Sequence, residues 1–192
     1  MNLHYETVSP LLKETLQKLV NSPIFKDFTL IGGTCLSLQL GHRRSIDIDL
    51  FTDIDYGTMN TKEMKEFIQR SFPYSENTDS LDTSALGYTL YMGDSPIDKI
   101  KVDFFYTEKF IFPIQEIDHI RIADIREIAA MKLSAITEEE PRQKDFWDIH
   151  ELNEKYSFKD MIDWGIKRNE WSVTEEGILN GFQKIDSVKR IT

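Results

Sequence analysis

The sequence predicts an α+β protein, in which a mixed β-sheet with flanking helices precedes a helical C-terminal part. Two patterns support this fold class: strand-like alternation dominates the first part of the chain, and helical periodicity dominates the rest. The 192 residues contain no repeat and no linker, and 40% of them are hydrophobic, which is enough for a sizeable core. We therefore expect a sheet domain over residues 1–122 and a helical part over residues 123–192 packed on it.

The first expected element is an amphipathic helix that ends near residue 20. Leucines recur at helical spacing, Ser9 can cap the helix and Pro10 suits its first position. A second helix is expected over residues 61–71, where Met64, Phe67 and Ile68 face inward. Strands are expected over 85–92 and 100–105.

A strand, a glycine turn and a short helix follow one another near residue 30. Residues 28–31 form a β-rich run that meets Gly32 and Gly33, and Thr34 is expected to cap a helix that Gly41 closes. A glycine pair that enters a helix lets backbone N–H groups approach a phosphate closely. The alternative is that the pair makes an ordinary turn.

Two acids share one face of the next expected strand. Residues 46–50 alternate strictly, so Asp47 and Asp49 project from the face opposite the apolar side chains, roughly 6 to 7 Å apart. Asp103 lies on a later strand and supplies a third carboxylate. Carboxylates suit Mg²⁺ or Mn²⁺, and a two-cation site clamps the attacking and departing oxygens of phosphoryl transfer. The alternative is a solvated strand face, but three acids there repel one another unless a positive charge lies among them.

Helices are expected throughout the last third of the chain. Asp124 with Glu127 resembles a capping box that opens a helix to about residue 137. Lys132 occupies the middle of the apolar row of this helix, so it needs a partner, either a carboxylate of the acidic cluster or a nucleotide phosphate. The alternative is that Lys132 reaches solvent along its stem. Further helices are expected over 144–152, 158–168 and 174–184.

Several charged residues have competing interpretations. Asp145 and Asp148 share a helix face, whereas Lys144 and Asp148 could merely form a surface pair. Arg142 and Lys144 place positive charge near Asp145. The turn residues Arg43 and Arg44 either are solvated or contact phosphate or RNA backbone. The full set of candidate RNA or phosphate contacts is Arg43, Arg44, Arg142 and Lys144.

Composition excludes several classes of protein. The formal charge of -10 argues against a protein that coats nucleic acid through long-range electrostatic attraction. It is compatible with a protein that binds one end of a nucleic acid at a local site. The single cysteine, Cys35, excludes an intramolecular disulfide framework. The N-terminal residues do not resemble a signal peptide and no window has the length of a membrane span, so we expect a cytoplasmic protein with no membrane partner.

Four ordered motifs resemble the AbiEii/AbiGii nucleotidyltransferase toxins, which are members of the polymerase-β-like nucleotidyltransferase superfamily. The first motif is TLIGGTCLSLQLGHRRSIDIDLF at 29–51, and the others are IKVDF at 100–104, IAAMKLSAI at 128–136 and RQKDFWDI at 142–149. The superfamily often has Gly-Ser where this chain has Gly32-Gly33, so Thr34 or Ser45 is expected to supply the hydroxyl.

The resemblance implies a polymerase-β-like fold and an enzyme of the EC 2.7.7 type. It implies transfer of NMP from an NTP, with Mg²⁺ or Mn²⁺ as cofactor, to an acceptor such as the 3′ end of a tRNA. It also implies a toxin of a type IV toxin–antitoxin or phage-defence pair with an AbiEi-like antitoxin as partner. The implied site contains three acids that are both metal ligands and catalytic residues: Asp47, Asp49 and Asp103. Its nucleotide-binding residues are Gly32, Gly33, Thr34, Ser45 and Lys132. Lys132 and Asp145 are catalytic as well, while Asp148 either belongs to the active site or holds its helix in place.

Two other functions stay open from the residues alone. Asp47-Ile48-Asp49 could be the nucleophile motif of a haloacid-dehalogenase-like phosphatase, although Phe51 is unusual there and the glycine pair would have no purpose. The chain could also be a non-catalytic nucleotide-binding module. Intact acids at positions 47, 49 and 103 argue against that second possibility.

Overall fold

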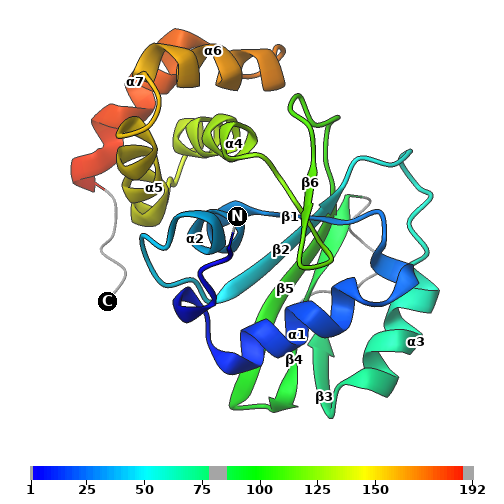
Figure 1. The fold of residues 1–192 in the computed structure, drawn as a ribbon. Helices are drawn as coiled ribbons and strands as arrows, with labels where there is room; N and C mark the ends of the chain where they lie inside the picture. The colour runs from blue at the N-terminus through cyan, green and yellow to red at the C-terminus, as the bar shows by residue number, and fades with distance from the viewer. Residues whose placement is uncertain (1, 78–85, 188–192) are drawn as a thin grey trace. The chain divides into compact units, whose positions relative to one another are not determined.

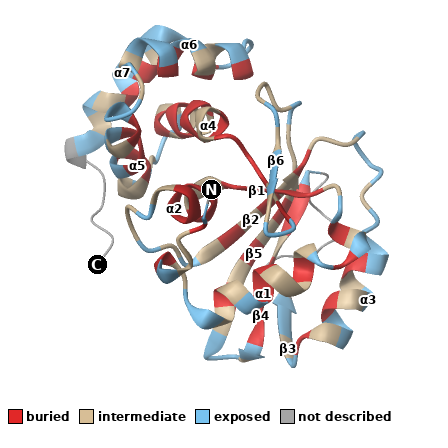
Figure 2. Cartoon of the chain, viewed as in Figure 1, coloured by how far each residue is buried: buried red, intermediate tan, exposed pale blue. Residues whose placement is uncertain are grey.

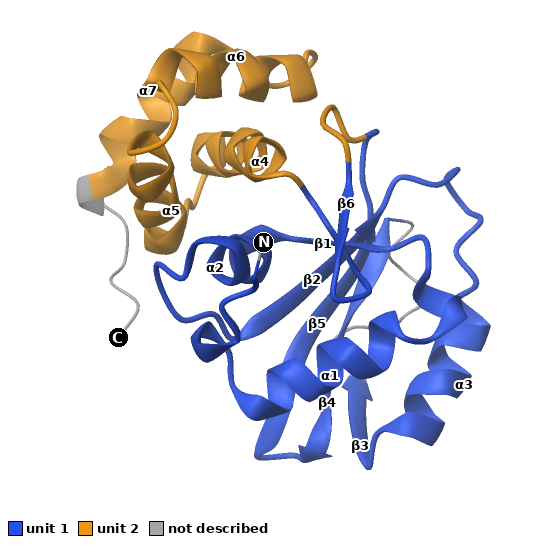
Figure 3. Cartoon of the chain, in the orientation of Figure 1, with its two compact units in different colours: residues 1–109, 114–123 blue, residues 110–113, 124–192 orange. Residues whose placement is uncertain are grey.

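The computed structural model describes residues 2–77 and 86–187, which divide into two compact units (Figure 3). Unit 1 comprises Met1–Lys109 and Ile114–Ala123, and unit 2 comprises Phe110–Pro113 and Asp124–Thr192. The domain division expected at residues 122 and 123 stays a prediction. Among the described residues, no helix combines the length and the apolar character needed to cross a membrane.

Unit 1 is built on a mixed β-sheet (Figure 1). In the described residues this sheet has seven strands in the order β3-β4-β5-β2-β1-β7-β6. The pairs β2–β5 and β1–β7 are parallel and the other neighbours are antiparallel, which confirms the α+β class. The strands are β1 Thr29–Ile31, β2 Asp47–Thr52, β3 Tyr74–Asn77, β4 Gly87–Ser95, β5 Asp98–Tyr106, β6 Gln115–Ile117 and β7 Ile120–Ile122.

The helices of unit 1 are α1 Pro10–Val20, α2 Gly32–Leu40 and α3 Thr61–Ser71, with short 3-10 turns at Tyr5–Thr7 and Pro23–Phe25. Helix α1 begins as predicted, because the Ser9 hydroxyl accepts a hydrogen bond from the Leu12 N–H at 3.1 Å. Helix α2 ends at Gly41, whose φ of 71° is left-handed, also as predicted. Helix α3 has the predicted bounds and buries Met64 and Ile68.

Buried and less buried residues alternate along the central strands β2 and β5, which are coloured by burial in Figure 2. Ile48 and Leu50 of β2 and Val102 and Phe104 of β5 are fully buried, and the Phe104 ring packs against other aromatic rings of unit 1. The acids that alternate with these residues are only partly buried. Alternation with a period of two therefore separates a hydrophobic core from a polar face, as expected.

Two details of unit 1 differ from the sequence prediction, and a third lies outside the described residues. Helix α2 begins at Gly32, because the positive φ of that residue (70°) turns the chain into the helix two residues before Thr34. Thr34 is therefore inside the helix and caps nothing. Strand β2 begins one residue later than expected, and Ile46 is 73% exposed. Residue 85, at the start of the strand expected over 85–92, lies outside the described residues.

Unit 2 contains the helices that the sequence predicts in its last third. These are α4 Ile125–Thr137, α5 Gln143–Asn153, α6 Phe158–Arg168 and α7 Glu175–Gln183, followed by a 3-10 turn at Lys184–Ser187. Helix α4 contacts each of the other three helices. Its apolar stripe is buried almost throughout, which accounts for its central place in the unit.

Only half of the predicted capping box is present at the start of α4. The Asp124 carboxylate accepts a hydrogen bond from the Arg126 N–H at 2.9 Å, so the cap is confirmed. The other predicted half, in which the Glu127 side chain would accept a hydrogen bond from the Asp124 N–H, is wrong. The buried Glu127 carboxylate instead accepts hydrogen bonds from the N–H groups of Ile111 and Phe112 and lies 2.7 Å from the Arg168 guanidinium. These partners offset part of the cost of burying the Glu127 charge, although burial still raises the pKa of Glu127 above its ordinary value.

An ion-pair cluster inside unit 2 joins α4 to α5. Lys132 Nζ lies 2.5 Å from Asp145 Oδ1 and 2.8 Å from Asp148 Oδ2, and the three side chains are at most 5% exposed. Arg142 Nε donates a further hydrogen bond to Asp145 at 2.9 Å. The interpretation in which Lys132 reaches solvent is wrong, and Asp148 is buried beside Lys132 instead of lying on the surface. Mutual neutralisation explains how these charges tolerate burial.

We predict that Lys132→Met lowers the free energy of unfolding by about 3 to 5 kcal/mol, because it leaves two buried carboxylates without their shared cation. The matched control is Lys159→Met on α6, which removes an exposed lysine and should change stability by less than about 0.5 kcal/mol. Urea denaturation followed by tryptophan fluorescence measures both. Equal effects of the two substitutions would contradict a structural role for the cluster.

Candidate active site

Parallel pairing of β2 and β5 brings the three predicted metal ligands to one face of the sheet. The register places Asp49 opposite Asp103 and Asp47 opposite Lys101. Side chains in register on neighbouring strands project to the same side, and residues two apart on a strand share a face. Three carboxylates and one ammonium therefore gather on the polar face of unit 1.

Two donors hold the Asp103 carboxylate. Thr89 lies opposite Asp103 on β4, and its hydroxyl donates to Asp103 Oδ1 at 2.6 Å. Lys101 Nζ donates to Asp103 Oδ2 at 2.6 Å. Both oxygens of Asp103 thus have a fixed partner within unit 1, and the side chain is only 14% exposed. These two donors hold the carboxylate in one orientation.

Lys101 is the positive charge that the three acids need. Desolvation lowers the pKa of Lys101, but the hydrogen bond to Asp103 and the charges of Asp103, Asp47 and Asp49 outweigh it and raise this pKa above its ordinary value. Lys101 is therefore an ammonium at neutral pH. Sequence analysis did not select it, although strand alternation already places residue 101 on the same face as Asp103.

The residues that could hold a divalent cation have suitable chemistry but are engaged elsewhere. Carboxylate oxygens are the ligands that Mg²⁺ prefers. In the ranges 2–77 and 86–187, however, no group of three or more His, Cys, Asp or Glu side chains forms a ready-made metal site. Asp103 is occupied by Thr89 and Lys101, as described. The metal-binding roles of Asp47, Asp49 and Asp103 stay predictions.

The glycine pair lies directly against charged side chains of the same unit. A Cβ atom at Gly32 would collide with the Asp49 carboxylate, and one at Gly33 would lie 2.5 Å from Arg43 Nη2. The positive φ of Gly32 adds a second reason for glycine at that position. The close approach that sequence analysis assigned to a phosphate is thus used, in this structure, by Asp49 and Arg43.

Thr34 and Ser45 connect the glycine turn to the acid-bearing strand. The Thr34 hydroxyl lies 2.8 Å from Ser45 Oγ and within hydrogen-bond reach of the Asp47 carbonyl oxygen. Thr34 is 1% exposed, so its contacts are internal to the protein. The structure brings these two predicted nucleotide-binding hydroxyls together, and their contact with a nucleotide stays a prediction.

The basic candidates occupy different surroundings. Arg43 is partly buried and donates to the Arg44 carbonyl oxygen at 3.0 Å, whereas Arg44 itself is exposed. Arg142 and Lys144 belong to unit 2, where Arg142 pairs with Asp145. Lys132 and Asp145 belong to unit 2 as well. The phosphate, RNA and catalytic contacts expected of these residues stay predictions.

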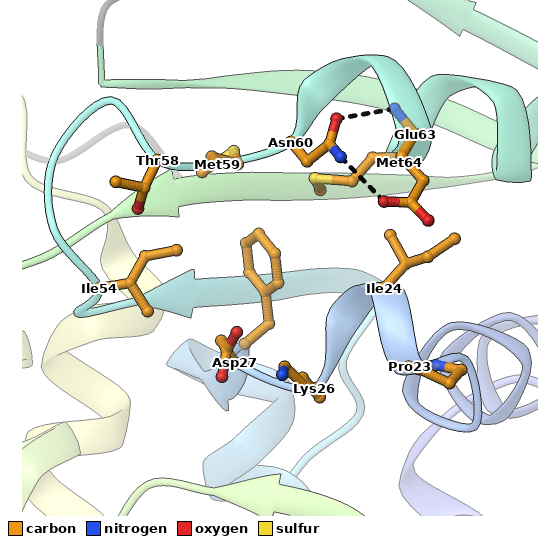
Figure 4. A pocket seen from close by; sticks show the side chains of 11 residues that line it. Pro23, Ile24, Lys26, Asp27, Ile54, Thr58, Met59, Asn60, Glu63 and Met64 are labelled. Atoms are coloured by element: carbon orange, nitrogen blue, oxygen red, sulfur yellow. Dashed lines mark hydrogen bonds between the residues drawn. The ribbon is translucent and has the colours of Figure 1, made fainter.

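A separate cavity of about 340 Å³ lies in unit 1 between the 3-10 turn at Pro23–Phe25 and the start of α3 (Figure 4). Its wall includes Phe28 and Ile54, which adjoin the beginning of β1 and the end of β2. Asn60 and Glu63 on its rim exchange two hydrogen bonds that cap α3. None of the predicted site residues lines this cavity, so it is not the site that the motifs describe.

Comparison with solved structures shows the fold. The chain is similar to the Helicobacter pylori protein JHP933, with a TM-score of 0.51 and 16% identity over 92% of this chain and 90% of that one. It is also similar to the nucleotidyltransferase toxin MenT4 of Mycobacterium tuberculosis, with a TM-score of 0.54 and 13% identity over 81% of this chain and 61% of that one. The polyadenylate synthase of Megavirus gives a TM-score of 0.51 and 15% identity over 76% of this chain and 32% of that one. The fold is that of the nucleotidyltransferases.

Comparison of sequences shows the family. A protein of Aquifex aeolicus is 34% identical over 155 residues, which cover 76% of this chain and 67% of that protein. The model of the family described as nucleotidyl transferase AbiEii toxin, type IV toxin–antitoxin system, matches residues 14–170. That match includes the glycine turn, the three acids of the sheet and the Lys132 cluster. The chain therefore belongs to the AbiEii family of nucleotidyltransferase toxins.

Proposed function

We propose that this nucleotidyltransferase moves NMP from an NTP to an acceptor hydroxyl in a Mg²⁺-dependent reaction of the EC 2.7.7 type, with the 3′ end of a tRNA as acceptor. The observation that carries the proposal is the register of β2 and β5, which places Asp47, Asp49 and Asp103 on one face beside the glycine turn. Three carboxylates on one face are suitable ligands for the cations that assist phosphoryl transfer.

The start of α2 is the proposed triphosphate site. The capping residue Ile31 gives no side-chain hydrogen bond to the helix, so its side chain leaves the first backbone N–H groups of α2 to other acceptors. A helix N-terminus with glycine at its first positions favours a phosphate. Arg43, whose guanidinium reaches Gly33, adds positive charge on the same side. Gly32, Gly33 and Thr34 then orient the α-phosphorus toward the carboxylates.

The acids have distinct proposed roles. Asp47 and Asp49 would hold the cations, and Asp103 either completes the metal site or accepts the proton of the acceptor hydroxyl. A bound divalent cation would supply positive charge for the triphosphate and the departing pyrophosphate. The acceptor oxygen forms a bond to the α-phosphorus while the bond from that phosphorus to pyrophosphate breaks. Thr89 and Lys101 hold the Asp103 carboxylate in one orientation.

The biological role follows from the family and not from the site geometry. We propose that the chain is the toxin of a type IV toxin–antitoxin or phage-defence pair, that it acts in the cytoplasm, and that an AbiEi-like antitoxin opposes it. The exposed Arg44 beside the turn is a candidate for contact with the RNA backbone. Lys132 and Asp145 are proposed to assist at the phosphates in addition to their structural pairing. Other RNAs or a protein are the alternative acceptors.

We predict that Asp47→Asn abolishes transfer of label from NTP to RNA, lowering the rate at least about 1000-fold, because loss of one charge weakens both cation binding and stabilisation of the transition state. The assay incubates purified protein with total RNA and each of four α-labelled nucleotides in Mg²⁺. The control Asp55→Asn removes an exposed acid of the same segment and should retain activity.

Three outcomes of this assay are informative. Equal labelling by wild type and Asp47→Asn would overturn the assignment. Nucleotide binding without any turnover would favour a silent binding module, and hydrolysis of generic phosphate esters would favour the phosphatase alternative. Label on protein instead of RNA would replace the proposed acceptor while keeping the reaction.

We predict that Gly32→Ala lowers transfer at least about tenfold, because the new methyl group displaces the Asp49 carboxylate. Gly57→Ala is the matched control, since Gly57 also has a positive φ (83°) but open space around its α-carbon. Both variants should lose about 1 to 2 kcal/mol of stability through the left-handed conformation. Equal activity of the two variants would contradict the role of the glycine turn in placing Asp49.

A further inference from the structure

We propose that Lys101 is an internal counter-ion of the acidic face, which occupies Asp103 in the metal-free protein and yields it to a divalent cation. Lys101 Nζ donates to Asp103 Oδ2 at 2.6 Å, and Lys101 lies opposite Asp47 in the register of β2 and β5. It is a positioning residue, distinct from the predicted ligands. This inference rests on the proposed metal-dependent function.

Burial makes the pairing necessary. The Asp103 side chain is 14% exposed and the Lys101 side chain 36% exposed, so water screens their charges only in part. Asp47 and Asp49 lie on the same face at the neighbouring positions of β2. Without a cation, three partly buried carboxylates would repel one another. Lys101 supplies that cation from within the strand itself, two residues before Asp103.

The same contact opposes metal binding. A divalent cation that used Asp103 Oδ2 would have to displace the ammonium, because that oxygen already accepts a hydrogen bond from Lys101. Asp103 Oδ1 stays with Thr89, whose hydroxyl anchors the carboxylate during the exchange. Lys101 therefore stabilises the acidic face when no cation is bound, and it lowers the affinity of that face for the metal alone.

A nearby lysine provides a matched control. Lys99 lies two residues earlier on the same face of β5, but its Nζ pairs with Glu76 Oε2 at 2.8 Å on the neighbouring part of the sheet. Lys99→Met removes an equal charge from the same strand without touching the Asp103 contact. Lys101→Arg keeps the charge of Lys101 and tests whether a conservative replacement restores the wild-type behaviour.

The experiment measures two properties of the purified full chain. The first is the melting temperature in EDTA, where Lys101→Met should lose about 4 °C more than Lys99→Met. The second is Mn²⁺ binding by electron paramagnetic resonance without nucleotide, where Lys101→Met should bind at least about tenfold more tightly than wild type. Lys99→Met should bind like wild type, and Lys101→Arg should be close to wild type in both measurements.

The outcomes separate this inference from the function on which it rests. If wild type binds Mn²⁺ and Lys101→Met binds it equally or more weakly, the counter-ion role is overturned while the metal-dependent function stands. If Lys101→Met melts like Lys99→Met in EDTA, the role in the metal-free protein is overturned. If wild type binds no Mn²⁺ at millimolar concentration and Asp47→Asn transfers label equally well, the proposed function fails together with the inference.

Discussion

The site depends on the parallel pairing of β2 with β5. A shift of that register by one residue would turn every side chain of one strand to the opposite face, which would bury the acids and expose Leu50 or Val102. The hydrophobic core therefore fixes the register, and the register fixes Asp49 beside Asp103. Concentration of negative charge on the polar face is a direct consequence of how the apolar face packs. The remaining features of the site orient these acids or neutralise their charge.

Contacts of Asp103 and of Asp49 within unit 1 stabilise the negative charge. Lys101 and Thr89 each donate a hydrogen bond to one oxygen of Asp103, so both carboxylate oxygens have a partner within unit 1. Gly32 lets the Asp49 carboxylate approach the backbone at the start of α2, where the partial positive charge of the helix favours an anion. A side-chain ammonium and a helix terminus thus neutralise part of the negative charge that cations are proposed to neutralise during catalysis.

Elements with a strong local signal could be predicted from the sequence, and elements that depend on partners could not. Alternation in β2 and the cap at Ser9 are local properties, and both are confirmed. The hairpin of β6 and β7 was missed because its turn, Asp118-His119, adopts positive φ without glycine. Lys101 was missed because its role appears only once two strands are paired. For Lys132, the sequence indicated a need for a partner but left burial open, and the actual partners, Asp145 and Asp148, lie on a helix whose packing the sequence does not specify.

The central claim is that the acids of β2 and β5 converge on divalent cations beside the start of α2. A crystal of the full chain grown with Mn²⁺ and a non-hydrolysable nucleotide tests it most directly, because anomalous scattering locates manganese without assumptions about ligands. The account predicts anomalous peaks within coordination distance of the carboxylates of Asp47, Asp49 and Asp103, about 2.0 to 2.4 Å, with the triphosphate at Gly32 and Gly33. Manganese bound elsewhere, with those three carboxylates uncoordinated, would contradict it.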